Sequence, residues 1–444
     1  MSRLDLPNIV MITTHDIGQQ LHCYGARTVQ SENLDQLAQR GVRFSHAFST
    51  APQCSPARAA LATGRYPHAN GVMGLAHDEF AWHLPPSETH LAEHLQHVGY
   101  QTVLYGLQHV TSTAKVRKLG FEEAYTDDTR TTVADRVVEW IEGYGQKPFR
   151  KPFYLEIGFA DTHTPWNTHL PDWTKGTERP RWLPPYPGSD AEMAAFQGQV
   201  FAVDRAVGKI VQALETHGLL NNTWLIFTSD HGVALPRAKG TLYDPGIEIP
   251  LIMFWPHGGI DGGRVWPSLV SHVDVVPTIL DALGLVQHDQ LQGQSLWPLL
   301  TGKSYVERKE IFAEKTYHTT YDPIRAIRTP THKFIMHFNT YDIADVTIDG
   351  KASGSFNVLR EELTRQHQYV ELYNLVEDPL ERVNIAFEDV SRMVVMELMQ
   401  RLRDWMEATD DPLLHGMVSS PTSRRALRLI RDDFALRQWL EGTR

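Results

Sequence analysis

The sequence predicts an α/β protein: a large mixed, mostly parallel sheet sandwiched by helices, then a smaller C-terminal domain with a short antiparallel sheet and helices. Two observations predict this class. Apolar runs alternate with amphipathic segments through the first two thirds of the 444 residues, which is typical of a parallel sheet covered on both faces. From about residue 310, short apolar runs follow one another with little helix between them, which indicates antiparallel strands. We therefore expect a large domain over residues 1–305 and a smaller α+β domain over residues 306–444.

The elements of the large domain follow from the spacing of its apolar residues. Residues 8–13 form a near-continuous apolar run, which predicts a strand buried on both faces. Similar runs predict further strands at residues 100–105, 152–159, 223–229 and 249–254. Apolar residues at helical spacing predict helices at residues 33–40, 88–98, 191–217 and 275–283. Ser31 is the candidate N-cap of the first of these helices.

The apolar runs that predict strands in the small domain are shorter than those of the large domain. Four apolar runs predict strands at residues 311–312, 326–328, 333–336 and 370–373. Amphipathic patterns predict two terminal helices, at residues 393–405 and 423–440. Residues 164–190, within the large domain, are rich in Pro and Trp, which predicts a long ordered loop of the kind that often borders a site.

Composition excludes several classes of protein. Hydrophobic residues make up 42% of the chain and charged residues 21%, which excludes a disordered chain. No run approaches the ~18 apolar residues that a membrane span needs, and the first residues do not resemble a leader peptide, so we expect a cytoplasmic protein without a membrane partner. The net charge of −11 argues against a nucleic-acid partner. Two cysteines, Cys23 and Cys54, do not make a disulfide scaffold, and a homo-oligomer is left open.

Histidine and aspartate residues follow the ends of four predicted strands. In an open parallel sheet the carboxyl ends of the strands meet at one edge, where ligands bind. The pairs His15–Asp16 and Asp230–His231 supply ligands that together could hold one divalent cation. Taken singly, Asp16 and Asp230 are equally well explained as turn residues. The side chains that this argument brings to one edge are His15, Asp16, His109, Asp161, His163, Asp230 and His231.

Cys54 lies in the most informative stretch of the sequence. Pro56 suits the first turn of a helix, so Cys54 is expected at a helix N-terminus, where the helix dipole favours an anion. Arg58 lies one turn further along and can reach back toward an oxyanion. From the residues alone, Cys54 could be an activated thiolate or a buried cysteine beside a helix start.

The stretch from Cys54 to Arg65 resembles the signature of the type I sulfatases, a family of the alkaline-phosphatase superfamily. It has the order Cys-x-Pro-x-Arg followed by Ala-x-Leu-x-Thr-Gly-Arg. The resemblance extends along most of the chain and implies an alkaline-phosphatase-like fold. Further segments that resemble motifs of the family are residues 9–16, 228–232, 239–243 and 371–379. Within the family the chain looks most similar to the heparan N-sulfatases, on residues 70–75, 106–110 and 314–328.

The resemblance implies a sulfatase that uses a modified cysteine and a divalent metal. A formylglycine-generating or anaerobic maturation enzyme would oxidise Cys54 to formylglycine, whose hydrated form would attack sulfur. Arg58 and Lys239 would neutralise the charge that develops on the sulfate. His163 would protonate the leaving group, and His109 would then remove a proton from the hydrated formylglycine. The metal ligands that the resemblance implies are His15, Asp16, Cys54, Asp230 and His231.

Two positions depart from the family pattern. His15 stands where the family usually has its first metal-binding aspartate. The metal is therefore expected to be Ca²⁺, with Mn²⁺ as the alternative that added imidazoles favour. Leu107 stands where the family has a lysine that contacts sulfate, and a nearby cation could take over that contact.

The expected substrate is a small sulfated saccharide of the glycosaminoglycan type, with an N-sulfated glucosamine as the first candidate. A phosphonate monoester or phosphodiester hydrolase of the same superfamily is the alternative that the changes at His15 and Leu107 keep open. A third interpretation is a glycan-binding protein without catalysis, which only Leu107 supports. The candidate sugar contacts, for which packing and ion pairs at the domain interface are an equal alternative, are His77, Asp78, His318, Asp322 and Arg325.

Overall fold

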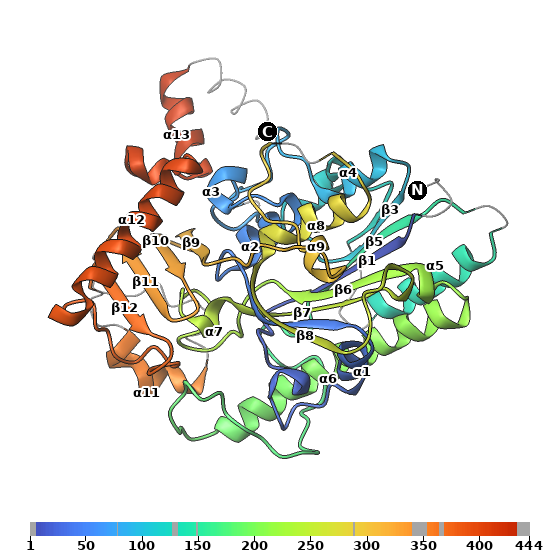
Figure 1. Cartoon of the computed structure of the whole chain (residues 1–444), viewed down its shortest axis with the longest axis horizontal. Helices are drawn as coiled ribbons and strands as arrows, with labels where there is room; N and C mark the ends of the chain where they lie inside the picture. Colours follow the sequence, from blue (N-terminus) through green and yellow to red (C-terminus); the bar gives the residue numbers. More distant parts are fainter. Residues whose placement is uncertain are drawn as a thin grey trace.

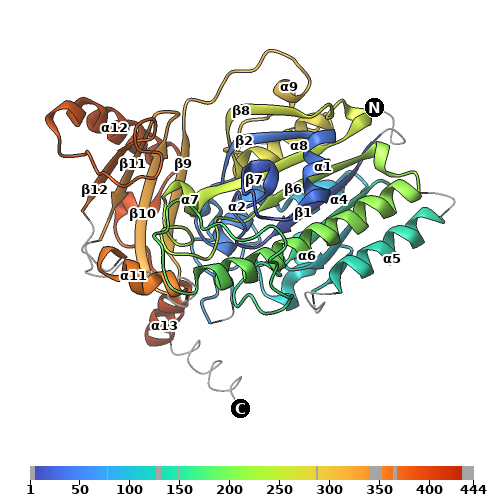
Figure 2. The same cartoon turned by 90° about the horizontal axis from the view of Figure 1, so that it is seen from below.

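A computed structural model describes residues 6–77, 79–126, 132–147, 150–286, 289–339, 353–363 and 368–432 of the chain. Two sheets and the helices packed around them account for the fold (Figure 1). The smaller sheet lies beyond one end of the larger one in both views (Figure 2). Within these described ranges, no helix combines the length and the apolar character needed to cross a membrane.

The large sheet has eight strands. In chain order they are β1 (Asn8–Thr14), β2 (Val42–Phe48), β3 (Gln101–Gly106), β4 (Glu123–Tyr125), β5 (Phe153–Phe159), β6 (Thr223–Ser229), β7 (Glu248–Phe254) and β8 (Arg264–Ser271). Their order across the sheet is β4-β3-β5-β1-β6-β7-β2-β8. Neighbouring strands are parallel, except that β7 runs antiparallel to β6 and to β2. The central strands β1 and β6 are buried along their whole length, as expected for a parallel sheet covered on both faces.

Helices cover both faces of the large sheet (Figure 2). The helices on one face are α1 (Glu32–Arg40), α5 (Val133–Gly145) and α6 (Ser189–Thr216). Those on the other face are α2 (Cys54–Thr63), α4 (Leu91–His97), α8 (Val275–Ala282) and α9 (Trp297–Leu300). Because side chains alternate along a strand, Val10 and Ile12 of β1 pack with the first group, and Ile9 and Met11 pack with the second. Two one-turn helices, α3 (Pro67–Asn70) and α7 (Asp244–Ile247), lie in connections.

The small sheet is antiparallel, in the order β12-β11-β10-β9. Its strands are β9 (Ile311–Tyr317), β10 (Tyr321–Arg328), β11 (His332–His337) and β12 (Val370–Asn374). One face packs on the large domain, where Ala313 and Ala326 meet Phe48 at the end of β2. The other face packs on α12 (Arg392–Ala408) through Phe334 and Trp405. Two further helices are α11 (Gly354–Leu363) and α13 (Pro421–Arg431), and α13 projects from the body of the molecule in Figure 1.

The fold class predicted from the sequence is confirmed, and each predicted strand overlaps an observed one. The helix predicted at 88–98 begins three residues later, at Leu91. The predicted helix at 423–440 corresponds to α13, and its part beyond residue 432 lies outside the described residues. Ser31 occupies the N-cap position of α1, but its hydroxyl donates to Asp35 over 3.2 Å and makes no capping bond. Among the described residues, the strands and helices without a counterpart in these predictions are β2, β4, β8, α3, α5, α7, α9 and α11.

Candidate active site

The carboxyl ends of β1, β5 and β6 lie side by side and bring the residues after them together. The backbone NH of His15 donates to the carbonyl of Phe159 over 3.1 Å, and the NH of Asp230 donates to the carbonyl of Thr14 over 3.1 Å. These bonds carry the parallel pairing one step past the strands. The residues that follow the three strands therefore share one edge of the sheet, as the sequence predicted.

Five donor groups from these strand ends and from α2 converge at this edge. Their ligand atoms all lie within 4.8 Å of one another, and all five residues are buried. His15 Nδ1 lies 3.0 Å from Asp230 Oδ2 and 3.2 Å from Asp16 Oδ1. His231 Nε2 lies 3.1 Å from Asp16 Oδ1 and 3.4 Å from Cys54 Sγ. The group, called the edge cluster below, consists of the five residues that the resemblance implied as ligands: His15, Asp16, Cys54, Asp230 and His231.

Backbone bonds hold the carboxylates of the edge cluster in place. Asp16 has a left-handed backbone, with φ of 45°, which is uncommon for a residue other than glycine. Its NH donates to Asp230 Oδ1 over 2.9 Å, and the same oxygen accepts the NH of His231 over 2.9 Å. Asp230 therefore links the residues after β1 to those after β6, and this link stabilises the unusual conformation at Asp16.

Two cations pair with these carboxylates. Arg58 Nε donates to Asp230 Oδ2 over 3.0 Å, and Lys239 Nζ donates to Asp16 Oδ2 over 2.7 Å. Burial alone would raise the pKa of the Asp16 carboxyl, but the charge of Lys239 holds that pKa well below its usual value. Burial likewise opposes ionisation of Asp230, whose pKa is nonetheless lowered by its cationic neighbours. Both groups are therefore carboxylates at neutral pH.

The donor set fits a divalent cation. His231 Nδ1 lies 2.9 Å from the carbonyl of Gly232 and donates to it in the neutral ring. His231 Nε2 then presents a lone pair to Asp16 Oδ1 at 3.1 Å, so that two acceptors face each other. A cation between them would relieve this contact. Burial lowers the pKa of His15 to about 4, so its imidazole is neutral and able to ligate at neutral pH.

Cys54 begins α2, with Gln53 at the N-cap position. Its side chain is only 2% exposed. Burial raises the pKa of the Cys54 thiol well above its ordinary value, and the nearby carboxylates act in the same direction. Burial therefore favours the neutral thiol of the unmodified residue, which supports the interpretation as a buried cysteine over that as an activated thiolate.

His109 follows β3 in a loop that Gln108 closes. Gln108 Oε1 accepts the backbone NH groups of Val110 and Thr111, and its Nε2 donates to the carbonyl of Thr111. His109 has φ of 61°, and its ring lies 5.8 Å from that of His15 and contacts His77 through the two Nε2 atoms. Burial lowers the pKa of His109 well below its ordinary value, and the neighbouring histidines lower it further. The ring is therefore a base that faces the edge cluster in its neutral form.

His163 and Lys239 lie on the opposite side of His15. Lys239 Nζ is 3.4 Å from His163 Nε2, and the ring of His163 contacts the ring of His15 edge-on at 4.9 Å. His163 Nδ1 lies 2.6 Å from the carbonyl of Thr164, so Nε2 is the atom available to a ligand in the site. The carboxylate of Asp161, which follows the same strand, pairs with His169 Nε2 at 2.7 Å.

Arg58 also contacts the position where the family lysine is missing. Its Nη1 donates to the backbone carbonyl of Leu107 over 3.3 Å, and its buried Nη2 has no hydrogen-bond partner among the described residues. The Leu107 loop approaches β5 so closely that a Cβ at Gly158 would lie 1.7 Å from the Leu107 carbonyl oxygen. Glycine at this position therefore allows the two strand ends to meet, and Arg58 keeps an unused donor beside the edge cluster.

The five predicted sugar contacts have different surroundings. His77 is exposed and touches His109. Asp78 lies outside the described residues. Asp322 pairs with the buried Lys315 at 2.8 Å, and His318 is buried in the turn that joins β9 to β10.

Arg325 is fully buried in a network of ion pairs and hydrogen bonds. Its guanidinium makes a bidentate pair with Asp411, at 2.6 and 3.0 Å, and donates to the carbonyls of Lys315 and Ile324. Its Nη2 also lies 3.4 Å from Glu314. Both carboxylates belong to residues 306–444, so the geometry corresponds to packing and ion pairing within the small domain, whereas a direct sugar contact remains a prediction.

Sequence reasoning missed two residues that shape the site. Gln53 donates its side-chain amide to the carbonyl of Tyr317 at the end of β9, so the small sheet braces the start of α2. Gln108 fixes the His109 loop as described above. The only sequence signals are their places directly before Cys54 and His109, because the partner of Gln53 lies 264 positions away.

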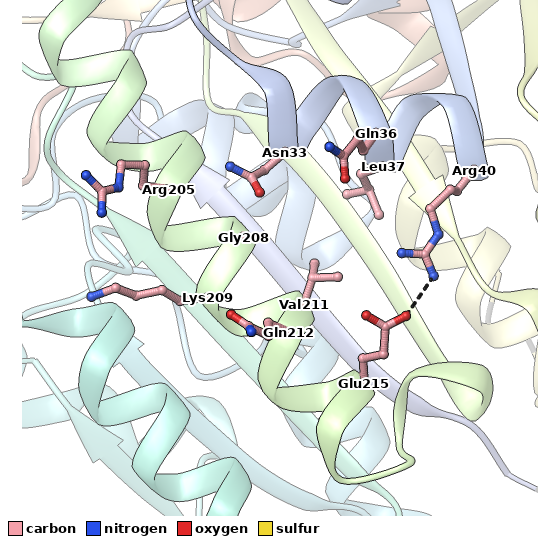
Figure 3. A pocket seen from close by; sticks show the side chains of 10 residues that line it. All are labelled: Asn33, Gln36, Leu37, Arg40, Arg205, Gly208, Lys209, Val211, Gln212 and Glu215. Atoms are coloured by element: carbon pink, nitrogen blue, oxygen red, sulfur yellow. Dashed lines mark ion pairs between the residues drawn. The ribbon is translucent and has the colours of Figure 1, made fainter.

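Two surface hollows lie apart from these residues. A groove of about 430 Å³ runs between α1 and α6, and its Arg40 pairs with Glu215 at 3.5 Å (Figure 3). A cleft of about 510 Å³ lies between the two domains and is lined in part by Trp182, Glu248 and Arg328. Neither hollow contains a residue that the sequence predicted for the site.

Comparison with known proteins gives consistent matches over most of the chain. The family model described as "Sulfatase" matches residues 7–285, and the model described as "N-sulphoglucosamine sulphohydrolase, C-terminal" matches residues 237–360. Human N-sulphoglucosamine sulphohydrolase is 27% identical over 91% of this chain and 91% of its own. Human arylsulfatase A is 30% identical over 85% of this chain and 83% of its own.

Solved structures share the fold. The structure of a 2-O GAG sulfatase has a TM-score of 0.71 at 22% identity and covers 94% of this chain and 95% of its own. A structure solved with its substrate D-glucosamine-2-N,6-O-disulfate has a TM-score of 0.70 at 20% identity and covers 91% of this chain and 98% of its own. At these identities the likeness shows the architecture alone.

Proposed function

The chain belongs to the sulfatase family of sulfuric ester hydrolases, and on this basis we propose that it hydrolyses a sulfate ester or an N-sulfate of a sugar. The observation that carries the proposal is the position of Cys54 at the start of α2. Its Sγ lies 3.4 Å from His231 within a cluster of five metal-compatible donors. Arg58 and Lys239 border the same cluster. A nucleophile, a metal site and two cations thus meet where a sulfate would bind.

In the proposed mechanism Cys54 is converted to formylglycine by a maturation enzyme, and His15, Asp16, Asp230 and His231 hold the metal. When present, these two groups supply a hydroxyl nucleophile and positive charge at the sulfate. We propose Ca²⁺ as the ion because the donor set contains two carboxylates, with Mn²⁺ as the alternative that its two imidazoles favour. Metal analysis of the purified protein tests this choice.

The other side chains of the site have separate roles in the proposed reaction: charge stabilisation and proton transfer. Arg58 directs its unpartnered Nη2 toward the developing oxyanion, and Lys239 adds a second positive charge beside it. His163 directs Nε2 into the site while Nδ1 donates to the Thr164 carbonyl, so in the proposed mechanism the doubly protonated ring gives its Nε2 proton to the leaving oxygen or nitrogen of the sugar. His109, kept neutral by burial, accepts a proton when sulfate is released. Burial of these groups excludes water and strengthens each charge interaction.

An N-sulfated glucosamine is the substrate that we propose first. Residues 237–360 match the C-terminal model of N-sulphoglucosamine sulphohydrolase, which supports this choice beyond the family itself. His77, His318 and Asp322 are the proposed sugar contacts among the described residues. Asp78 stays a prediction from the sequence.

Hydrolysis of a phosphonate monoester or phosphodiester is the second candidate function. The observation that favours this second function is Leu107, which stands where the family has a lysine that contacts sulfate. Its side chain carries no charge, and it accepts a hydrogen bond from Arg58 through its backbone carbonyl. Turnover of an aryl sulfate against an aryl phosphonate separates the two candidates.

The deciding experiment combines mass spectrometry with turnover. Protein made together with a maturation enzyme is digested with trypsin, and the peptide spanning residues 44–58 is weighed. We expect the mass loss for exchange of CH₂SH by CHO, and release of sulfate from N-sulfoglucosamine at a rate that follows the converted fraction. A converted protein that cleaves the aryl phosphonate and no sulfated substrate would transfer the proposal to the second candidate. An unconverted thiol in an active protein would refute the formylglycine mechanism.

A further inference from the structure

The helix α13 carries a positively charged face in an acidic protein. Four arginines lie between residues 424 and 431, whereas residues 412–431 contain neither Asp nor Glu and the whole chain has a net charge of −11. All four arginines are exposed. In the part of the chain that the structure describes, none of them forms an ion pair with a carboxylate. Their charge is therefore available to an anionic partner.

The spacing of these arginines places them along one side of the helix. Arg424, Arg428 and Arg431 follow the i, i+4, i+7 pattern, and Arg425 borders them, three positions before Arg428. At a rise of about 1.5 Å per residue, the stripe is about 10 Å long. The four residues are called the arginine face below.

Contacts at the start of α13 orient this face. The guanidinium of Arg424 lies over the ring of Trp82, 5.5 Å from its centroid. Two residues earlier, Thr422 Oγ1 donates to the carbonyl of Glu79 over 3.2 Å. The arginine face therefore starts on the chain segment that contains Glu79 and Trp82.

That segment borders the candidate active site. His77, close to Glu79 in the chain, contacts His109. The NH of the preceding residue, Ala76, donates to the hydroxyl of Ser55 over 2.9 Å, next to Cys54. The segment around Glu79 thus lies between the edge cluster and α13. An anionic chain that leaves the site past His77 would run toward the start of α13, where Arg424 lies on Trp82.

We propose that the arginine face of α13 binds sulfate or carboxylate groups on sugar residues adjacent to the one in the active site, so that the enzyme acts on multiply charged oligosaccharides. The inference rests on the proposed function, since it assumes that a sulfated sugar occupies the site. Guanidinium groups pair with sulfate and carboxylate oxygens through two parallel hydrogen bonds, which suits a partner with several such groups.

The test compares two triple variants with the same change of charge. Arg425→Gln, Arg428→Gln and Arg431→Gln remove three charges of the arginine face and leave Arg424 on Trp82. The control variant removes three exposed charges elsewhere, with Lys303→Gln, Lys309→Gln and Arg392→Gln. Glutamine has nearly the helix propensity of arginine, and α13 buries none of its residues, so both proteins should fold.

Binding is measured by calorimetry with a heparin-derived tetrasaccharide, in full-length protein carrying Cys54→Ala so that the ligand is not consumed. We expect the arginine variant to raise Kd about tenfold at low salt, from roughly twofold for each exposed charge contact. Added salt should shrink this difference, because it screens exposed charges. The control variant should stay within twofold. The chemically desulfated tetrasaccharide, which keeps only its carboxylates, should bind more weakly and show a smaller difference between the arginine variant and the wild type.

Turnover gives the second readout. In protein with Cys54 intact, the arginine variant should lose about tenfold in kcat/KM on the tetrasaccharide and nothing on a small aryl sulfate. Equal losses in both triple variants, or no loss in either, would overturn the proposal. Sedimentation of the wild type with phosphatidylserine vesicles, undisturbed by the tetrasaccharide and lost in the arginine variant, would overturn it in favour of a membrane surface. A protein that binds the tetrasaccharide through α13 but releases no sulfate would refute the proposed function alone.

Discussion

Two buried clusters of this protein offer similar donors to a metal ion but are connected differently. The edge cluster combines two carboxylates, two imidazoles and a thiol. The second group, called the junction cluster, consists of His68, Glu314 and Asp411, whose donor atoms also lie within 4.8 Å of one another. His68 Nδ1 lies 2.8 Å from Glu314, and the bidentate pair with Arg325 uses both oxygens of Asp411.

The difference between the clusters lies in the cation that the protein itself provides. At the junction cluster, the N–H groups of Arg325 pair with two carboxylates and with nearby backbone carbonyls. The guanidinium therefore occupies the position that a metal ion would take. At the edge cluster, Arg58 and Lys239 each pair with one carboxylate oxygen, and Arg58 Nη2 stays unpartnered. Closeness of possible metal ligands therefore does not distinguish an active site from a structural network. The distinguishing feature is a hydrogen-bond donor that has no partner among the described residues and lies beside Cys54.

Replacement of Cys54 should have the largest effect on turnover. We expect Cys54→Ala to lower sulfate release by at least about 10⁴-fold, since loss of a nucleophile removes the chemistry itself. The matched control is Cys23→Ala, because burial and the neighbouring Asp35 raise the pKa of Cys23 to about 12 and keep it an unreactive thiol far from the site. Sulfate release by the two purified proteins decides the outcome, and an active Cys54→Ala protein would contradict the edge cluster as the active site.

Replacement of Asp230 tests whether the edge cluster binds metal and the junction cluster does not. Asp230→Asn should reduce turnover by about 10³-fold, because it removes a charge that stabilises the site, and it should lower the metal bound per chain. Asp411→Asn in the junction cluster should destabilise the fold while leaving the metal content unchanged. Elemental analysis of both variants beside the wild type gives the comparison. Equal metal loss in the two variants would show that the clusters do not differ as described.

Lys239 tests whether a cation of the edge cluster acts on the reaction. Lys239→Met should lower kcat by about 10²-fold, the usual scale for loss of one group that stabilises transition-state charge. Lys209→Met provides the control, since Lys209 is exposed and pairs with Asp135 on the helical face. Steady-state kinetics of both variants are the measurement. A change confined to KM would assign Lys239 to binding rather than to charge stabilisation in the transition state.

Of the variants considered, replacement of Arg325 should change turnover least and the free energy of unfolding most. Arg325→Met leaves the carboxylates of Glu314 and Asp411 buried without their partner, which costs about 3–5 kcal/mol in the free energy of unfolding. Below its Tm the variant should retain kcat within about threefold. Arg403→Met, which breaks the exposed pair with Glu407, should cost at most about 1 kcal/mol. A rise in KM for the sugar at unchanged stability would instead support the predicted sugar contact of Arg325.

The elements best predicted from the sequence are those whose burial is uniform. β1 and β6 lie between two helical layers, so their apolar runs are continuous and unambiguous. β2 was missed because its half-buried residues and a bulge between Phe44 and Ala47 break the alternation, and β8 contains Pro267. α5 has buried Val133, Val137 and Ile141 at helical spacing, so its signal was present in the sequence and was overlooked.

The candidate site was predictable where topology alone brings residues together. His15, Asp16, Asp230 and His231 follow strands that are neighbours in the sheet, so their meeting follows from the parallel order. Contacts between loops do not follow from any local pattern. The pairing of His77 with His109 and the bond from Gln53 to Tyr317 depend on how the two domains and their loops pack, which no single segment encodes.

The burial of Cys54 has a consequence for the order of events in the cell. In the folded chain, the thiol is almost inaccessible, and the carbonyl of Tyr317 is bonded to Gln53 beside it. Tyr317 leaves the ribosome more than 260 residues after Cys54. A maturation enzyme of the kind proposed above would therefore have a limited interval in which to modify Cys54, which opens when Cys54 emerges and closes when β9 docks. Variants that fold faster around α2 would carry fewer modified molecules, even though every residue of the site is intact.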